Sequence, residues 1–179
     1  MSEPTIPYNG RCHIAVGSNI RPEDNIPRAL DRLNRHVPIK AVSMFYRTAP
    51  INRPEQPDYL NGVVAAEYAG ALHDLKFDLL RRIEAAAGRV RGADPWAART
   101  LDLDIALCGG MVVNAPGLVV PDPDIRTRPF LAAALLELEP DLVMPDSLTP
   151  LKQEVAPDAL AGLTPDPVFS QSLKERYCS

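Results

Sequence analysis

The placement of proline constrains the fold of this chain more than any other feature. Its 179 residues include 19 prolines, about twice the number expected at an average usage near 5%. They cluster at residues 4–7, 50–57, 116–129 and 140–167. Because proline fixes φ and lacks an amide hydrogen, it interrupts both helices and sheet ladders. These clusters are therefore predicted to be loops, with the regular elements in the segments between them.

Six segments before residue 110 have the periodicity of regular elements. A strand, a helix, two strands, a helix and a strand are predicted over 12–16, 22–35, 39–47, 61–68, 72–87 and 101–107. Gly88 is the expected stop of the second helix, and 89–99 is predicted to be a loop. The pair Gly109-Gly110 predicts a hairpin between 101–107 and 111–114. A buried helix is predicted over 130–139.

This order of elements is that of a ferredoxin-like β-α-β-β-α-β core. The predicted class is α+β, with a largely antiparallel sheet and helices packed against it. The length fits one compact domain, which we assign to residues 1–154. Beyond it, periodicity is weak among the prolines, so residues 155–179 are expected to be an extended or mobile C-terminal extension.

Charge and hydropathy exclude several classes of protein. The net charge of −4 argues against a general binder of nucleic acid or anionic membranes. Apolar runs such as 131–136 are far shorter than the ~20 residues of a membrane span. The first residues show no basic region followed by an apolar one, so no secretory signal is predicted. The three cysteines lack a C-x-x-C pattern, which favours a reducing cytoplasm and predicts Cys12 and Cys108 to be small core residues rather than a disulfide.

Asp102-Leu-Asp104 is the sharpest local motif. On a strand, alternate side chains share a face, so both carboxylates point the same way while Leu101 and Leu103 point the other way. Two adjacent carboxylates repel unless a cation lies between them. Mg²⁺ favours one or two carboxylates together with phosphate oxygens. A solvated strand face with two incidental acids is the alternative.

An arginine-rich segment precedes this acid pair. Residues 81–99 contain five arginines against Glu84 and Asp94, a local charge of +3. Arginine offers planar, bidentate donors that fit phosphate oxygens. Arginines beside an acid pair supply the positioning and charge neutralisation that phosphoryl transfer requires. A solvated basic loop is the alternative, but adjacency to the acid pair favours a triphosphate site.

The few aromatic residues offer candidate stacking surfaces. Trp96 lies within the arginine-rich segment, Tyr59 follows a proline-rich loop, and Phe130 follows another. Each could stack on a flat heterocycle, and a core role is the alternative for each. Asn61 shares a strand face with Tyr59 and offers both donor and acceptor to a ring edge. No histidine pattern supports a zinc site or a Ser-His-Asp arrangement, and no Walker motif is present.

Several motifs in one order resemble the 6-hydroxymethyl-7,8-dihydropterin pyrophosphokinase family of folate biosynthesis. The resemblance runs over residues 14–145. The motifs are Ile14-Ala-Val-Gly-Ser-Asn-Ile20, Phe45-Tyr-Arg-Thr-Ala-Pro50, Gln56-Pro-Asp-Tyr-Leu-Asn61, Gly88-Arg-Val-Arg91, Trp96 and Arg99-Thr-Leu-Asp-Leu-Asp104. The resemblance implies a cytoplasmic, Mg²⁺-dependent enzyme that transfers pyrophosphate from ATP to the pterin hydroxymethyl group and releases AMP. It also implies a monomer or weak homodimer with no nucleic-acid or membrane partner.

The resemblance also implies a role for individual residues of the site. Asp102 and Asp104 would hold two Mg²⁺ ions, and Arg89 and Arg99 would stabilise the transferring group. The nucleotide contacts it implies are Glu84, Arg91, Trp96, Ile105 and Arg128, with Trp96 on a loop that closes over the substrates. The pterin contacts it implies are Thr48, Ala49, Pro50, Ile51, Asn52, Tyr59, Asn61 and Phe130.

The chain departs from the family pattern at Asp122, where a histidine that helps to hold ATP phosphates is usual. An acid there would repel the triphosphate unless a metal or Arg126 compensates, so we expect weaker ATP binding than is typical. Asn52 stands where glycine is frequent, and Gly117 and Val119 stand where some members have a polar contact to the nucleotide. Ala97-Ala98 replaces a usual Gly-Pro.

Two other functions are compatible with parts of this pattern. A degenerate relative that binds pterin or nucleotide without turnover is suggested by Asp122. A metal-dependent phosphodiesterase acting on a nucleic-acid backbone would use the same acids and arginines, but the net charge of −4 disfavours it.

Overall fold

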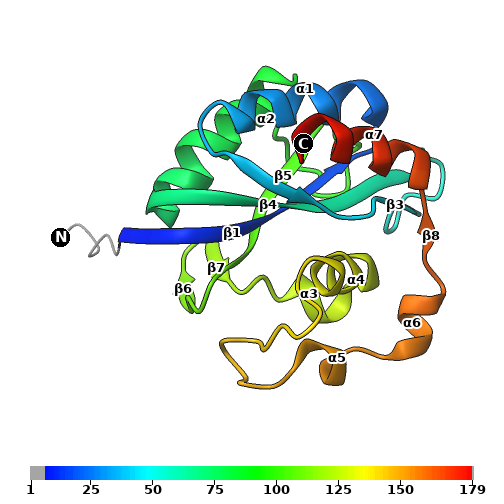
Figure 1. Cartoon of the computed structure of the whole chain (residues 1–179). Coiled ribbons are helices and arrows are strands. Elements are labelled where there is room, and N and C mark those ends of the chain that lie inside the picture. Colours follow the sequence, from blue (N-terminus) through cyan, green and yellow to red (C-terminus); the bar gives the residue numbers. More distant parts are fainter. Residues whose placement is uncertain (1–6, 179) are drawn as a thin grey trace.

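A six-stranded antiparallel sheet forms the centre of the protein, as a computed structural model shows for residues 7–178 (Figure 1). Residues 1–6 and Ser179 lie outside the described residues, so the expectation that no secretory signal is present stays untested. The strands are β1 (Pro7–Ser18), β2 (Ile39–Val42), β3 (Tyr46–Thr48), β4 (Tyr59–Ala71), β5 (Asp102–Cys108) and β8 (Thr164–Pro165). They lie in the order β5-β1-β4-β3-β8, and β2 also pairs with β4. This arrangement confirms the predicted α+β class and its largely antiparallel sheet.

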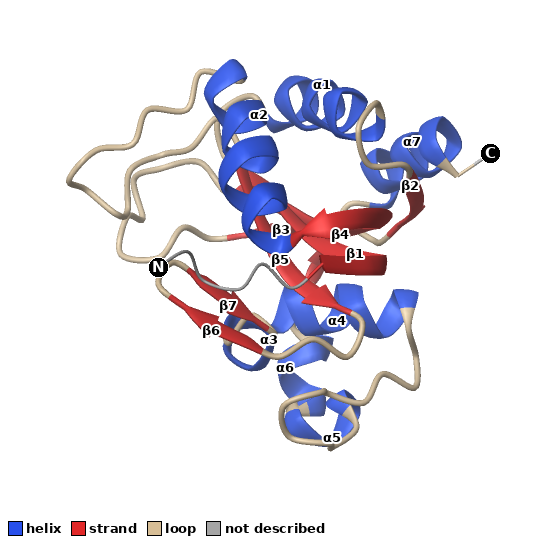
Figure 2. Cartoon of the chain, turned by 90° about the vertical axis from the view of Figure 1, so that its left-hand side faces the viewer, coloured by secondary structure: helices blue, strands red, loops and turns tan. Residues whose placement is uncertain are grey.

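Helices cover both faces of the sheet (Figures 1 and 2). On one face lie α1 (Pro22–Asn34), a π-helical segment η1 (Asp74–Leu80), its continuation α2 (Arg81–Ala86), and α7 (Pro167–Tyr177). On the other lie α3 (Asp124–Thr127), α4 (Pro129–Leu138), α5 (Leu151–Glu154) and α6 (Pro157–Ala161). Each layer encloses its own apolar cluster, with Ile14, Leu30 and Leu80 in the first and Val63 and Leu135 in the second.

The predicted helices over 22–35 and 130–139 are confirmed as α1 and α4. The helix predicted over 72–87 also forms, and Leu75, Leu79, Leu80 and Ile83 are buried as its apolar stripe requires. Its first part is a π-helix rather than an α-helix. Gly88 ends it with φ +82°, a left-handed conformation that glycine adopts without a Cβ penalty.

The single strand predicted over 39–47 is two strands, β2 and β3. The chain leaves the ladder between them because its amides find other partners. The Met44 amide donates to Glu137 Oε2 at 2.6 Å, and the Phe45 amide donates to Ser170 Oγ at 2.8 Å. Those acceptors belong to α4 and α7, so only the tertiary arrangement supplies them.

The hairpin predicted between 101–107 and 111–114 is wrong. β5 pairs with β1 instead, and a separate ladder joins β6 (Val113–Ala115) to β7 (Leu118–Val120). The turn between these short strands is Pro116-Gly117, with φ +74° at Gly117. Proline followed by glycine suits the two central positions of a tight turn. β6 therefore pairs with β7, which directly follows this turn, and not with β5.

The C-terminal segment is built into the sheet and the core rather than extended from them. β8 pairs with β3, and α7 contributes Phe169, Leu173 and Tyr177 to the apolar cluster beneath α1. The Tyr177 hydroxyl donates to the Pro27 carbonyl at 2.9 Å. The expectation of an extended or mobile tail is therefore wrong for the described part of 155–179.

Cys12 and Cys108 are buried core residues, as predicted, but they form a disulfide. They lie opposite each other on β1 and β5. Ninety-six residues separate them in sequence, so only strand pairing brings them together. The prediction of no disulfide is wrong, and this pair no longer supports a reducing compartment.

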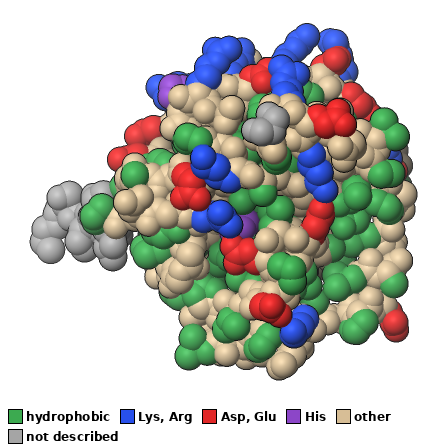
Figure 3. Space-filling model, viewed as in Figure 1, with side chains coloured by type: hydrophobic (Ala, Val, Ile, Leu, Met, Phe, Trp, Pro, Cys, Tyr) green, Lys and Arg blue, Asp and Glu red, His purple; other side chains and the backbone are tan. Residues whose placement is uncertain are grey.

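On the face shown in Figure 3, Lys and Arg side chains are interspersed with Asp and Glu rather than gathered in one basic field. Between residues 7 and 178, no helix is both long enough and apolar enough to cross a membrane.

Candidate active site

The N-terminal end of β5 opens into a cleft of about 670 Å³. Its walls come from β1, β4, the loop after β3, the arginine-rich loop and the start of α4. The predicted site residues that line it are Thr48, Ala49, Pro50, Ile51, Tyr59, Asn61, Arg89, Arg91, Trp96, Arg99, Asp102, Asp104, Arg128 and Phe130. The tertiary structure therefore gathers in one cavity residues that lie as much as 82 positions apart (130 − 48).

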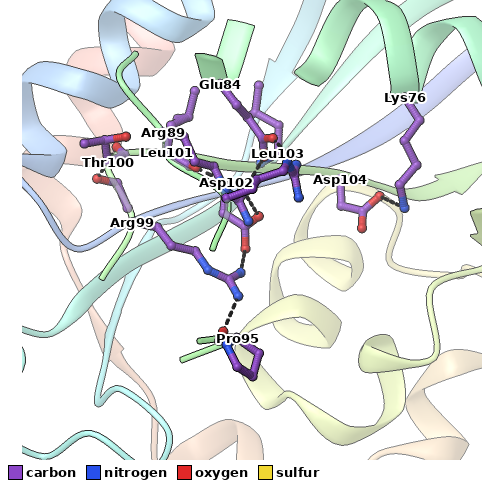
Figure 4. A network of polar contacts seen from close by, with 12 residues as sticks. Lys76, Glu84, Arg89, Pro95, Arg99, Thr100, Leu101, Asp102, Leu103 and Asp104 are labelled. Atoms are coloured by element: carbon purple, nitrogen blue, oxygen red, sulfur yellow. Dashed lines mark hydrogen bonds and ion pairs between the residues drawn. The ribbon is translucent and has the colours of Figure 1, made fainter. Parts of the chain in front are cut away.

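Asp102 is held between two arginines (Figure 4). Its Oδ1 accepts from Arg89 Nη1 at 2.5 Å, and its Oδ2 accepts from Arg99 Nη1. Desolvation works to raise the pKa of Asp102, but the positive charges of Arg99 and Arg89 outweigh it and hold the pKa below its ordinary value. Asp102 is thus an anion that fixes both guanidinium groups at the cleft floor.

Glu84 anchors Arg89, and also Arg91, from behind. Its side chain is 2% exposed and accepts from Arg89 Nη1 at 2.5 Å and from Arg91 Nη2. The Leu103 amide also donates to it at 2.8 Å. A carboxylate so enclosed requires these donors. Glu84 therefore holds the arginines from outside the cleft and does not line it.

Ser18, the last residue of β1, and Asn19, which follows it, position the arginine-rich loop. The Arg99 amide donates to Asn19 Oδ1 at 2.7 Å, and the Ser18 hydroxyl donates to the Thr100 carbonyl at 2.7 Å. Asn19 Nδ2 donates to Gln56 Oε1 at 3.2 Å, and Gln56 Nε2 donates to the Trp96 carbonyl at 3.0 Å. The turn after β1 thus joins the loop before β4 to the loop before β5.

Asn61 forms a polar wall of the cleft. It is 8% exposed, and its Nδ2 donates to Thr48 Oγ1 at 2.7 Å. A Cβ at Gly17 would lie 2.3 Å from Asn61 Oδ1. Only glycine at position 17 therefore leaves room for this amide.

The three aromatic residues that the sequence singles out all line the cleft. Phe130 is 9% exposed and Trp96 is 43% exposed, so Phe130 presents an edge of the core while Trp96 projects from its loop. The Arg128 guanidinium lies 5.9 Å from the Phe130 ring centre. Tyr59 belongs to β4, next to the strand that carries Thr48. The cleft thus combines ring surfaces with a cationic floor.

Asp104 has a cation partner of its own (Figure 4). Lys76, from η1, places its Nζ 2.7 Å from Asp104 Oδ1. Lys76 and its helical neighbour Arg81 both line the cleft, and Arg81 lies over the Phe77 ring at 4.3 Å. No motif in the sequence singles out Lys76, because its position depends on how η1 packs against β5.

Asp122 also lines the cleft. Its backbone amide donates to the Ala106 carbonyl of β5 at 2.9 Å, and its Oδ1 accepts from the Asp124 amide at 2.8 Å. Burial, together with the negative charges of Asp104 and Asp124, raises the pKa of Asp122 to about 6. Among the described residues it has no ion-pair partner.

Arg126, one of the two groups that could compensate for the charge of Asp122, does not do so. It points away from the cleft and pairs with Asp146 at 2.8 Å and with Glu154. This cluster joins α3 to the segment around α5. Arg126 therefore stabilises the packing of α3 against this segment and does not act in the cleft.

Two other predicted residues do not line the cleft. Ile105 is 1% exposed and packs in the core on the face of β5 opposite the two acids. Asn52 has φ +59°, a left-handed conformation that asparagine tolerates better than most residues. This explains why a residue other than glycine can occupy the position.

The residues present fit a divalent cation bound together with phosphate. Asp102 and Asp104 share one face of β5 at the cleft, and Mg²⁺ takes one or two carboxylates with phosphate oxygens and water. Within the described part of the chain, no group of three or more His, Cys, Asp or Glu side chains forms a complete metal cage. The acid pair thus suits a metal that arrives with a nucleotide.

A ferredoxin-like sheet that ends in an acid pair, paired arginines and ring surfaces defines a class: enzymes that hold a polyphosphate beside a flat ring. The family model described as 7,8-dihydro-6-hydroxymethylpterin-pyrophosphokinase matches residues 13–140. This chain belongs to that family.

Curated relatives support the assignment along almost the whole chain. A 2-amino-4-hydroxy-6-hydroxymethyldihydropteridine pyrophosphokinase of Haemophilus influenzae is 36% identical over 159 residues, covering 86% of this chain and 98% of the relative. The protein of that name in Pseudomonas aeruginosa is 40% identical over 139 residues, covering 76% and 85%. The one in Methylorubrum extorquens is 34% identical over 158 residues, covering 87% and 94%.

Proposed function

We propose that this chain transfers the pyrophosphoryl group of ATP to the hydroxyl of 6-hydroxymethyl-7,8-dihydropterin, as a step of folate biosynthesis. The observation that carries the proposal is that Asp102, held by Arg89 and Arg99, lies in the same cleft as Tyr59, Asn61 and Phe130. In this reaction the bond between the α- and β-phosphates breaks and a bond from the pterin oxygen to the β-phosphorus forms. AMP leaves, and the hydroxyl proton is released.

The ring-binding half of the cleft orients the acceptor hydroxyl. We assign stacking on the pterin to Tyr59 and Phe130, hydrogen bonding at its edge to Asn61, and further contacts to the loop 48–52. The Asn61 amide is already fixed by Thr48. Such pre-organisation lowers the barrier by holding the hydroxyl in line with the phosphorus.

The cationic half of the cleft stabilises the charge of the transferring group. Arg89 and Arg99 lie at fixed positions before substrate arrives, so they need little reorganisation during the reaction. We assign nucleotide contacts to Arg91, Trp96 and Arg128, and closure over the substrates to the Trp96 loop. Glu84 is assigned a positioning role, because it holds the arginines without reaching the cleft.

We propose that Asp102 and Asp104 hold two Mg²⁺ ions that arrive with ATP. When bound, such ions neutralise the phosphate charge and polarise the bond that breaks. We further propose that the catalytic residues all lie within 1–154, that the protein is cytoplasmic, and that it is a monomer or weak homodimer.

Product analysis tests the reaction directly. The purified protein is incubated with Mg²⁺, ATP and 6-hydroxymethyl-7,8-dihydropterin, and AMP is separated from ADP by chromatography. We expect AMP without ADP, and only when the pterin and Mg²⁺ are both present. ADP would mean attack on the γ-phosphorus and a different kinase. Nucleotide binding without any product would favour the degenerate relative.

A further inference from the structure

Two cations that line the cleft, Lys76 and Arg81, have no part in the roles assigned above, and Lys76 is the one that meets an acid of the site. The Lys76 side chain is 17% exposed and its Nζ lies 2.7 Å from Asp104 Oδ1. Figure 4 shows it reaching Asp104 from the side away from Asp102. Arg89 and Arg99 pair with Asp102 and not with Asp104. Lys76 is therefore the counter-ion of the second acid.

The surroundings of Lys76 are rich in negative charge. Asp104, Asp122 and Asp124 all line the same part of the cleft. Asp124 has Arg128 at 4.0 Å, whereas Asp122 has no ion-pair partner among residues 7–178. The charge of Lys76 acts on Asp122 as well as on Asp104. One ammonium group thus serves two carboxylates.

A triphosphate that enters this region meets like charge. A divalent cation held by Asp104 would remove part of the repulsion, but it would take the carboxylate that pairs with Lys76. The released ammonium then lies beside phosphate oxygens and Asp122. A lysine suits such an exchange because its charge is compact and its stem flexible, whereas the planar fork of arginine favours one fixed partner.

We propose that Lys76 is a nucleotide-binding residue that occupies the place of a metal ion at Asp104 in the ligand-free protein and turns to the phosphate oxygens when the metal binds. The proposal rests on the proposed function, because it takes Asp104 as a metal ligand. In this proposal the Lys76–Asp104 ion pair breaks when metal and nucleotide bind, whereas a purely structural ion pair would persist. It also explains how an acid is tolerated at position 122.

Two binding constants separate the proposal from a structural role. Mn²⁺ binding in the absence of nucleotide is followed by electron paramagnetic resonance, and binding of a non-hydrolysable ATP analogue with Mg²⁺ by calorimetry. For Lys76→Met we expect analogue binding to weaken about tenfold, the loss of one charge-assisted contact. Mn²⁺ binding should tighten about threefold, because no ammonium competes for Asp104.

Matched variants complete the experiment. Lys76→Arg keeps the charge and should retain most of the analogue affinity. Lys40→Met removes an exposed lysine on β2, remote from the cleft, and should leave both constants unchanged. Adding Asp122→Asn to Lys76→Met should recover part of the lost affinity. The proposal is overturned if Lys76→Met leaves both constants within twofold, or if both weaken together with a loss of stability.

A second measurement uses the unaltered protein, so it does not depend on how a variant folds. Lysines are acylated with a limiting amount of an amine-reactive reagent. The extent of labelling at each lysine is quantified by mass spectrometry, with Lys40 as the internal standard. Mg²⁺ alone should increase the labelling of Lys76, because it frees the ammonium from Asp104. Mg²⁺ with the ATP analogue should protect it. Labelling indifferent to both would contradict the exchange.

Failure of this proposal can be told from failure of the proposed function. The unaltered protein is assayed in parallel for pterin-dependent AMP. If AMP forms while Lys76→Met binds nucleotide and metal like the unaltered protein, only the role of Lys76 is wrong. If no AMP forms but Lys76 shows the expected exchange, only the proposed reaction is wrong.

Discussion

Asp102 and Asp104 lie two residues apart on one face of β5, yet their surroundings differ. Asp102 meets two guanidinium groups, and Glu84 holds one of them, that of Arg89, from behind. Asp104 meets one ammonium group, beside two more carboxylates. Around Asp102, three arginines (Arg89, Arg91 and Arg99) pair with two carboxylates, those of Asp102 and Glu84. At the second, one lysine faces Asp104 and Asp122.

This difference shows that the two ends of the cleft are balanced in charge to different degrees. At the arginine end, around Asp102, the protein's own cations neutralise the acids. At the lysine end, around Asp104, they do not. The arginine end has surplus positive charge held in a fixed network, which suits stabilisation of a transferring phosphoryl group. The lysine end has surplus negative charge, which suits the metal ion proposed to bind there together with a triphosphate. Asp102 and Asp104 are therefore expected to contribute differently to phosphate binding, although the Asp-Leu-Asp motif is symmetric in sequence.

The largest expected effect separates the two acids by activity. Asp104→Asn should lower the rate of AMP formation by at least about 10³-fold, because the lysine end then lacks its metal ligand. Asp102→Asn should lower it by about 10²–10³-fold, through loss of both the metal ligand and the arginine anchor. Steady-state product assays measure both. An Asp102→Asn protein within tenfold of normal would show that Asp102 only holds arginines.

A smaller effect tests whether the arginine end is a fixed network. The Arg89 side chain is 10% exposed, whereas that of Arg91 is 54% exposed, and both bind Glu84. Arg89→Met should lower the free energy of unfolding by about 2 kcal/mol, because the buried Glu84 loses an ionic donor. Arg91→Met should cost less than about 1 kcal/mol. Urea titrations give both values, and equal losses would contradict the burial argument.

The smallest effect concerns the lysine end and its dependence on pH. Burial, with Asp104 and Asp124, raises the pKa of Asp122 to about 6, above the ordinary value near 4 in the unfolded chain. The folded state then binds more protons than the unfolded state between pH 4 and 6, so stability falls as pH rises through this window. Above pH 6 the penalty stays constant.

Asp122→Asn should remove that penalty. Without metal, in a chelator, we expect the variant to be more stable than the unaltered protein by about 1–2 kcal/mol at pH 8, with the difference vanishing near pH 4. The asparagine oxygen can still accept from the Asp124 amide. Urea titrations across this pH range provide the check. A difference that does not vary with pH would mean that packing, and not charge, decides the effect.

Local patterns in the sequence determined much of this molecule. Strand periodicity alone placed Asp102 and Asp104 on one face, since the two-residue repeat of a strand needs no partner. Apolar spacing gave α1, η1 with α2, and α4 within a few residues. The arginine-rich loop and the ring residues were identified from composition and resemblance, and the structure brings them into one cleft.

Only the tertiary structure decided the contacts between residues remote in sequence. The Cys12–Cys108 disulfide needs the pairing of β1 with β5, and the insertion of Phe169 needs α7 to fold back onto the sheet. Lys76 meets Asp104 because a π-helix packs against β5, and Arg126 is drawn from the cleft by Asp146. The physical reason is common to all of them. Periodicity determines which way a side chain points within its own element, whereas a partner from another element depends on how those elements pack.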